Sequence, residues 1–217
     1  MPDNRKGLRV LKQPAAESNN ANIQESPKAA AEKPAKNVAA NESMAKKTFP
    51  NETWVRSDSI KLQHEQMPSG AEGIIIAKSR LPINPTEEHD IIKEIKSAVI
   101  LKKHGSSVTL IPRVKDPLSG RFLSGPDAIV DGTLFEFKEV TGGIRRVGAR
   151  FMDSREQENN VYIRVANPNL TKQHIFGYFS NLINDKNYKG GYKGNIIFSF
   201  GDEERTYFFK IKDFKKP

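Results

Sequence analysis

GPDAIVDGTLFEFK, residues 125–138, is the stretch of the chain that decides its fold and its candidate site. Asp131-Gly132 stands between two runs in which apolar residues alternate, which is the strongest short-range signal for a β-hairpin with a two-residue turn. Such a turn fixes the pairing of the two strands, so that Ala128 lies opposite Phe135. The sequence therefore predicts a hairpin with a defined register.

Two acids of this hairpin, Asp127 and Glu136, fall opposite each other when the pairing is counted outward from the turn. Because side chains alternate between the faces of a strand, both acids and Lys138 are expected on one face, away from the apolar core. Like charges that face each other across a strand pair cost a few tenths to about 1 kcal/mol, so a compensating cation is expected. That cation is a divalent metal, Lys138 itself or a nearby arginine. Two acids with a lysine suit the cleavage of a phosphodiester.

The rest of the chain predicts helices and further strands around this hairpin. Apolar residues at helical spacing predict helices, and short apolar runs bounded by Gly, Pro or Asn predict strands. The predicted helices cover residues 86–104, 144–158 and 171–184, and the further strands cover 73–77, 107–111, 161–165, 196–200 and 206–211. Thr86, followed by acidic residues, is the expected start of the first helix. The expected fold is α+β, a small mixed sheet in which the hairpin carries the site and helices flank it.

The first 48 residues differ from the rest in composition. They contain no aromatic residue and are dominated by Ala, Lys, Glu, Asn, Pro and Ser, with nine Lys and Arg against five Asp and Glu. Such a segment buries too little apolar surface to order itself. We expect residues 1–48 to be a disordered basic leader or linker, 49–85 a short N-terminal extension of the domain, and 86–217 a nuclease-like domain.

The overall composition narrows the classes of function. The formal net charge is +9 at a sequence pI of about 9.6, which favours a polyanionic partner such as nucleic acid. The absence of cysteine excludes disulfides, thiolate zinc sites and cysteine nucleophiles. No apolar run approaches the roughly 20 residues that span a bilayer. We expect a soluble protein that is made in the cytoplasm and has no membrane span.

One chemistry that the hairpin suits is metal-dependent hydrolysis. Asp127 and Glu136 would hold Mg²⁺ or Mn²⁺ through oxygen ligands, and Lys138 would orient the attacking water. A third carboxylate is expected from the preceding helix, at Glu88 or Glu94. The hairpin resembles the PD-(D/E)XK nuclease superfamily, whose motif is met here by Pro126-Asp127 and Glu136-Phe137-Lys138. That resemblance implies a metal-dependent DNA nuclease.

A second resemblance covers most of residues 87–212. The matching stretches are 104–112, 126–132, 136–138 and 157–161. On these residues the chain resembles the C-terminal ribonuclease domains of CdiA-type contact-dependent inhibition toxins, in a barnase/EndoU/colicin/RelE-like group. The resemblance implies a transfer-RNA endonuclease that needs no metal or other cofactor, uses the ribose 2′-OH as nucleophile and places Lys138 near the scissile phosphate. It also implies export as a toxin and an acidic immunity protein as partner.

RNA cleavage without metal requires a proton-transfer group and a cation for the developing phosphorane charge. His174 is the histidine that we nominate for proton transfer, because it titrates near neutral pH and follows the basic region. The cation and the contacts to nucleic acid are expected from Arg145, Arg146 and Arg150, with Lys189 and Lys193 in a loop where tyrosines alternate with lysines.

Each of these patterns also has a purely structural interpretation. The acids and the lysine of the hairpin would then be a solvated strand face, and the arginines an exposed helix face paired with neighbouring acids. A third class of function follows, in which the chain is a nucleic-acid-binding module without catalysis. Cleavage separates this class from the two nuclease hypotheses.

Overall fold

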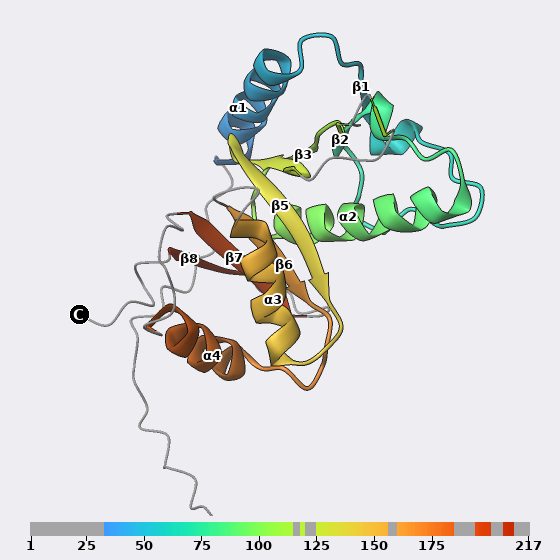
Figure 1. The fold of residues 1–217 in the computed structure, drawn as a ribbon. Helices are drawn as coiled ribbons and strands as arrows, with labels where there is room; N and C mark the ends of the chain where they lie inside the picture. The colour runs from blue at the N-terminus through green and yellow to red at the C-terminus, as the bar shows by residue number, and fades with distance from the viewer. Residues whose placement is uncertain are drawn as a thin grey trace, which may run out of the picture.

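The computed structural model describes residues 33–114, 118–119, 125–155, 160–184, 194–200 and 206–210. Its helices are α1 (Lys33–Thr48), α2 (Pro85–Lys103), α3 (Ile144–Arg155) and α4 (Lys172–Asn184), with short 3₁₀ helices at Ser57–Ser59 and Lys78–Arg80. Its strands are β1 (Trp54–Arg56), β2 (Ile75–Ala77), β3 (Val108–Leu110), β4 (Ala128–Val130), β5 (Thr133–Val140), β6 (Val161–Val165), β7 (Asn195–Phe200) and β8 (Thr206–Lys210). Figure 1 shows their arrangement.

The strands form one mixed sheet in which each strand lies beside the next in the sequence, from β1 to β8. The pairs β2–β3, β5–β6 and β6–β7 are parallel, and the remaining pairs are antiparallel. The parallel pairs β5–β6 and β6–β7 are connected through α3 and α4, as parallel strands require a crossover. The expected mixed sheet with a hairpin and flanking helices is confirmed.

The hairpin that the sequence predicts is β4 and β5. Asp131 and Gly132 have φ angles of +49° and +77°, as a turn with positive φ at both central residues requires. The ladder pairs Val130 with Thr133 and Ala128 with Phe135, as expected. Asp131 is the one non-glycine residue with positive φ in the described part of the chain, and its Oδ1 accepts the Ser107 N–H at 2.9 Å.

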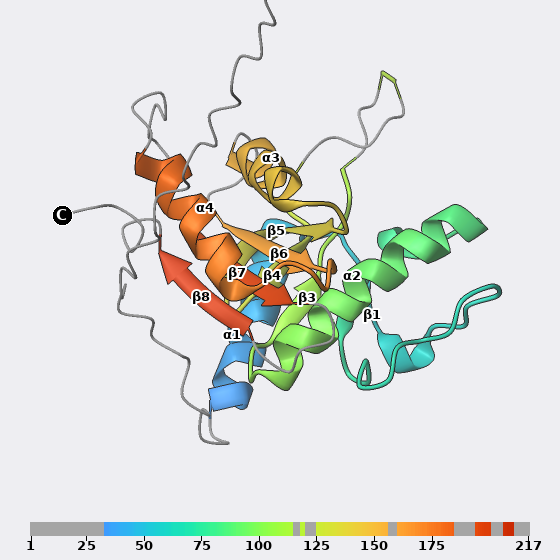
Figure 2. The ribbon, with the colours of Figure 1, turned by 90° about the horizontal axis from the view of Figure 1, so that it is seen from below.

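Helices cover both faces of the sheet (Figure 2). On one face α2 packs in a cluster that includes Ala128, Phe137 and Tyr162. On the other face α3 and α4 pack against strand residues such as Val161 and Ile163, which flank Tyr162 in β6. The sheet therefore forms the middle layer, and its two faces have separate apolar cores.

Helix α1 departs from the expected disordered leader. Residues 33–48 are helical in the structure, and Ala45 and Asn41 of this helix are buried against the sheet. Ala45 packs with Ile129 of β4, on the face opposite α2. The expectation is wrong for this segment because Ala45 and the buried amide of Asn41 hold the helix against the sheet. The amino-acid composition of a segment does not predict such individual contacts.

Helix α2 begins at Pro85, one residue earlier than the sequence predicts. Its N-cap is Asn84, whose Oδ1 accepts the Glu87 N–H at 2.9 Å, and not Thr86. Pro85 occupies the first helical position, where its missing N–H costs nothing. The end of the helix is as expected, with His104 at the C-cap and Gly105 after it at a φ of +87°. Among the helices of the described residues, none has the length and apolarity to cross a membrane.

Candidate active site at the junction of β4 and β5

The candidate site lies where β4 and β5 stop pairing. The ladder between β4 and β5 ends at Phe135. From Glu136 to Val140, β5 pairs with β6. The Asp127 N–H donates to the Phe135 carbonyl at 2.9 Å, and the Phe137 N–H donates to Asp127 Oδ2 at 2.9 Å. The Asp127 carboxylate thus takes the place of the next carbonyl of a neighbouring strand.

This arrangement corrects the expected direct pairing of Asp127 with Glu136. The last ladder pair is Ala128 with Phe135, and the Asp127 N–H bonds to that same Phe135. Asp127 and the first residue of β4, Ala128, then both face Phe135, which is the pattern of a β-bulge, and bulges re-aim side chains beside active sites. Asp127 therefore leaves the face that strict alternation assigns to it and points along the edge of β5.

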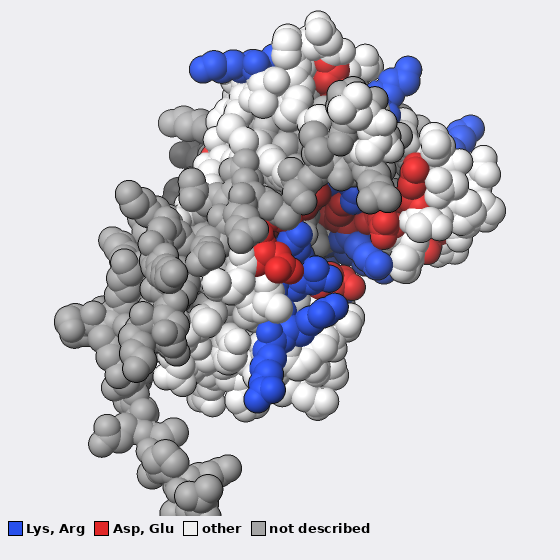
Figure 3. Space-filling model, viewed as in Figure 1, with Lys and Arg blue, Asp and Glu red and all other residues white. Residues whose placement is uncertain are grey.

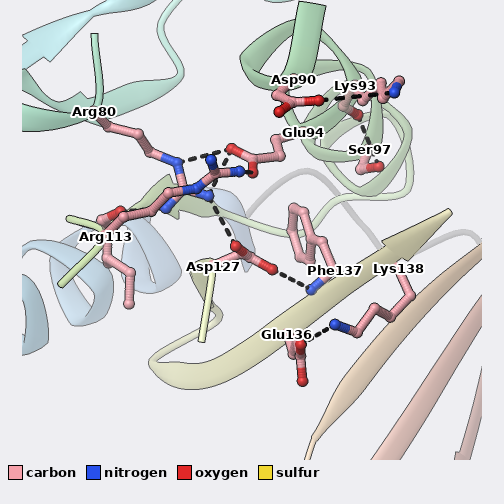
Figure 4. A network of polar contacts seen from close by, with 11 residues as sticks. Arg80, Asp90, Lys93, Glu94, Ser97, Arg113, Asp127, Glu136, Phe137 and Lys138 are labelled. Atoms are coloured by element: carbon pink, nitrogen blue, oxygen red, sulfur yellow. Dashed lines mark hydrogen bonds and ion pairs between the residues drawn. The ribbon is translucent and has the colours of Figure 1, made fainter. Parts of the chain in front are cut away.

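Asp127 is held there by Arg80, which lies at the end of the short helix after β2 (Figure 4). Arg80 Nη2 lies 2.9 Å from Asp127 Oδ1 and 2.6 Å from Glu94 Oε2, and Arg80 Nε donates to the same Glu94 oxygen at 2.8 Å. Arg80 Nη1 donates to the carbonyl oxygen of Ile111. The Arg80 side chain is only 2% exposed, so the contact is a desolvated, charge-assisted one.

Glu94 of α2 is the acid on the other side of Arg80. Its second oxygen, Oε1, pairs with Arg113 Nη2, and the Arg113 side chain is 31% exposed. Burial raises the pKa of Glu94, and the two guanidinium groups oppose that rise. Of the two helix acids that the sequence nominates, Glu94 lies at the site. Glu88 lies elsewhere and accepts the backbone N–H groups of residues 63–65.

Glu136 and Lys138 lie further along β5 and form an ion pair with each other (Figure 4). They share the α3 side of the sheet with their partners in β6, Val161 and Ile163. Burial raises the pKa of Glu136, Lys138 lowers it, and the nearby charge of Asp127 adds to the rise. The expected compensation is thus divided, because an arginine holds Asp127 and the lysine holds Glu136.

The arginines predicted to contact nucleic acid lie on α3. Arg145 and Arg146 are exposed in its first turn. Arg150 Nη1 lies 3.6 Å from Asp153 Oδ2 in an exposed ion pair. The charge of Asp153 also raises the pKa of Glu136, so this part of α3 lies near the site. Figure 3 shows acidic and basic side chains gathered between α2 and α3, with a band of basic side chains continuing over α3.

His174, nominated for proton transfer, is exposed in the first turn of α4. Its Nδ1 accepts the Thr171 N–H at 3.3 Å, and its own N–H donates to Thr171 Oγ1 at 3.4 Å. Both contacts belong to the start of the helix and neither connects His174 with the hairpin. The predicted contacts at Lys189 and Lys193 lie outside the described residues.

Sequence reasoning missed Arg80 and Arg113. Arg80 is 47 residues from Asp127 in the chain and belongs to no motif. The available signal was indirect, since two adjacent acids require a cation, and the sequence does not say which arginine supplies it.

The chain was compared with protein families, curated proteins and solved structures. No family model matches the sequence, and no curated protein matches it. Among solved structures, the chain is similar to the CdiA-CT/CdiI toxin and immunity complex from Burkholderia pseudomallei. It is 19% identical over 62% of this chain and 98% of that chain, with a TM-score of 0.46.

Proposed function

We propose that the chain is a nuclease that hydrolyses phosphodiester bonds at the junction of β4 and β5. The observation that carries the proposal is that Asp127, linked through Arg80 to the helix acid Glu94, lies near the Glu136–Lys138 ion pair of β5, where its charge raises the pKa of Glu136. These are the four positions that the PD-(D/E)XK resemblance requires. They come from a helix and a hairpin that the rest of the fold holds in place.

We propose that Asp127 and Glu136 hold a divalent cation as a pair of carboxylates. Mg²⁺ is commonly held by one or two protein carboxylates, and substrate phosphate oxygens and water complete its shell. We propose a site of this shared kind here, with two protein carboxylates and the remaining ligands from phosphate and water. When bound, such a cation polarises the phosphate and lowers the pKa of a bound water.

Lys138 is the residue that acts beside this pair. Its side chain is 20% exposed, and its ammonium pairs with Glu136, whose side chain is 3% exposed. A lysine so placed can hold the attacking water or neutralise charge on the phosphate. In either role it acts from the open edge of β5, where Asp127 replaces the neighbouring strand.

The substrate that we propose is RNA, with transfer RNA first, as the resemblance to CdiA-type toxin domains implies. The net charge of +9 and the exposed arginines of α3 support a polyanionic substrate. The same resemblance makes an acidic immunity protein the protein partner that we propose. We propose hydrolysis in preference to metal-free transesterification because two carboxylates and a lysine belong to the hairpin region, whereas the contacts of His174 are with Thr171.

The test is a cleavage assay with the full chain on total transfer RNA and on plasmid DNA, each with Mg²⁺, with Mn²⁺ and with EDTA. We expect RNA cleavage that requires metal. Cleavage of RNA in EDTA would replace hydrolysis by the 2′-OH mechanism, and cleavage of DNA alone would replace the substrate. Binding of either nucleic acid without cleavage would favour the non-catalytic module.

Two lysine variants make the assay specific for the site. Lys138→Met should lower kcat by at least about a hundredfold, the usual scale for a residue that assists proton transfer. Lys96→Met removes an exposed lysine from α2 and should leave cleavage unchanged. If both variants cleave as the wild type does, Lys138 has no catalytic role.

A further inference from the structure

We propose that Arg80 is a positioning residue that holds Asp127 in place for the cation, and that Glu94 anchors Arg80 instead of serving as a third cation ligand. The inference rests on the nuclease function proposed above. It assigns different roles to the acids that the motif groups together. Asp127 and Glu136 face the cation, and Glu94 acts through a guanidinium.

The first support is the way in which Arg80 is fixed. Its guanidinium contacts three partners from three elements: Glu94 of α2, the Ile111 carbonyl after β3 and Asp127 before β4. With the side chain 2% exposed, it has one position and cannot reach a nucleic acid outside the protein. A planar fork with several donors is the geometry that arginine provides and lysine does not.

The second support is the state of the Glu94 carboxylate. Arg80 binds one of its oxygens at 2.6 and 2.8 Å, and Arg113 binds the other. The Glu94 side chain is 11% exposed, less than the 18% of Asp127. Three contacts to guanidinium nitrogens thus fall on the Glu94 carboxylate, whereas each oxygen of Asp127 has one contact in the described part of the chain.

The third support is what Arg80 does for Asp127. The Phe137 N–H and Arg80 hold one oxygen each, so the plane of the carboxylate is set from two sides. Each carboxylate oxygen can accept more than one contact, so the remaining lone pairs stay available for a ligand. Without Arg80 the carboxylate would keep the Phe137 contact alone and could rotate about it.

The experiment combines Mn²⁺ binding, measured by calorimetry and electron paramagnetic resonance, with cleavage kinetics on the full chain. Asp127→Asn should lower Mn²⁺ affinity by more than about a hundredfold, because it removes a ligand. Glu94→Gln should lower it by less than about tenfold, the lower end for a supporting residue, since the glutamine oxygen still accepts from Arg80. Glu88→Gln, the other acid of α2, should leave Mn²⁺ affinity unchanged.

Kinetics then test Arg80 itself. Arg80→Met should reduce kcat about 10- to 100-fold with the KM for RNA nearly unchanged, because a buried residue supports the site without touching the substrate. Arg80→Lys keeps the charge and should recover part of the loss. Circular dichroism of each variant checks that the fold is retained, and Arg80→Lys serves as the test if Arg80→Met does not fold.

The outcomes separate this inference from the proposed function. If Glu94→Gln loses Mn²⁺ as strongly as Asp127→Asn, Glu94 is a ligand and the inference is overturned while the nuclease function stands. If Arg80→Met or Arg80→Lys raises KM and leaves kcat unchanged, Arg80 contacts the substrate and the inference is likewise overturned. A wild type that neither binds Mn²⁺ nor cleaves nucleic acid would end both proposals.

Discussion

Each acid of the candidate site is stabilised by its own cation, and this division gives the two acids different surroundings. Asp127 pairs with a buried guanidinium, and Glu136 pairs with the ammonium of a lysine. A rigid fork fixes geometry, whereas a lysine on a flexible stem exchanges partners readily. If the proposed function holds, we expect Lys138, and not Arg80, to be the cation that exchanges its acid for a substrate phosphate.

Glu88 shows the opposite use of a carboxylate on the same helix, as a purely structural anchor. It accepts the N–H groups of Gln63 at 2.8 Å, His64 at 2.7 Å and Glu65 at 3.2 Å. These hydrogen bonds, that from the Gln63 N–H first, lower the pKa of Glu88 below its ordinary value of 4.5. Glu88 is therefore ionised in the folded state at pH values where the unfolded chain is already protonated.

This lowered pKa gives a prediction about stability and pH. The stabilisation from Glu88 is complete above the unfolded pKa of 4.5 and is lost as the pH falls through the lower folded pKa. Glu88→Gln should therefore lower the Tm near pH 7, and its difference from the wild type should shrink in acid. Thermal unfolding followed by circular dichroism across this pH range measures both. An equal difference in Tm at every pH would contradict the assignment.

At the scale of elements, α1 is coupled to the hairpin through one buried side chain. Asn41 Nδ2 donates to Ser107 Oγ and to the Ile129 carbonyl, each at 3.1 Å, and Asn41 Oδ1 accepts the Gly132 N–H at 2.6 Å. The amide thus holds the turn of the hairpin that carries the candidate site. Residues 33–48 are in this respect part of the folded domain and not a leader.

Asn41→Ala should destabilise the fold, because it leaves the Gly132 N–H and the Ile129 carbonyl without their partner. Loss of a partner for buried polar groups costs about 1–3 kcal/mol, so the free energy of unfolding in urea should fall by that amount. Ser43→Ala, which changes an exposed residue of the same helix, is the control. If the two variants unfold at the same urea concentration, the buried amide does not hold the hairpin.

Helices α3 and α4 meet at Gly148, where a side chain has no room. A Cβ at this position would lie 2.4 Å from the Tyr178 hydroxyl oxygen and 2.8 Å from Tyr178 Cζ. Gly148→Ala should therefore force the helices apart and cost about 1–3 kcal/mol, the usual range for overpacking. Gly177→Ala, on α4 with no atom within 4 Å of the new Cβ, should be neutral or stabilise by up to about 1 kcal/mol. Urea unfolding of both variants tests the contrast, which would be absent if the tyrosine ring simply moved aside.

At the scale of the whole molecule, the features that could be predicted from sequence are those whose signal is local. Asp131-Gly132 specified the hairpin and its register, and Gly105 marked the end of α2. The features that could not be predicted depend on contacts between distant residues. Asn41 reaches Gly132 across 91 residues, and Arg80 reaches Asp127 across 47. No spacing in the sequence encodes such pairs, because tertiary packing brings them together.

The same distinction applies inside the site. Glu136 and Lys138 share a face because a strand alternates with period two, and this was predictable. The orientation of Asp127 was not, because a bulge at the start of β4 turns it toward Arg80. A bulge of one residue leaves the hydrophobic pattern of the strand intact, so the pattern does not reveal it.

The charge of the whole molecule leads to the last prediction, which concerns salt. Arg145 and Arg146 are exposed in the first turn of α3, and we expect them to contact phosphates of the nucleic acid. Each phosphate contact releases counterions on binding, so the logarithm of the association constant falls with the logarithm of the salt concentration by about 0.7–0.9 per contact. The double variant Arg145→Gln/Arg146→Gln should therefore bind transfer RNA with a shallower slope, by about 1.4–1.8 in total. Binding in EDTA between about 50 and about 200 mM KCl, followed by fluorescence, measures the slope without cleavage.

Lys96→Gln, which removes an exposed charge from α2, should leave the slope as in the wild type. Parallel lines for the double variant and the wild type would mean that these arginines form only a solvated helix face.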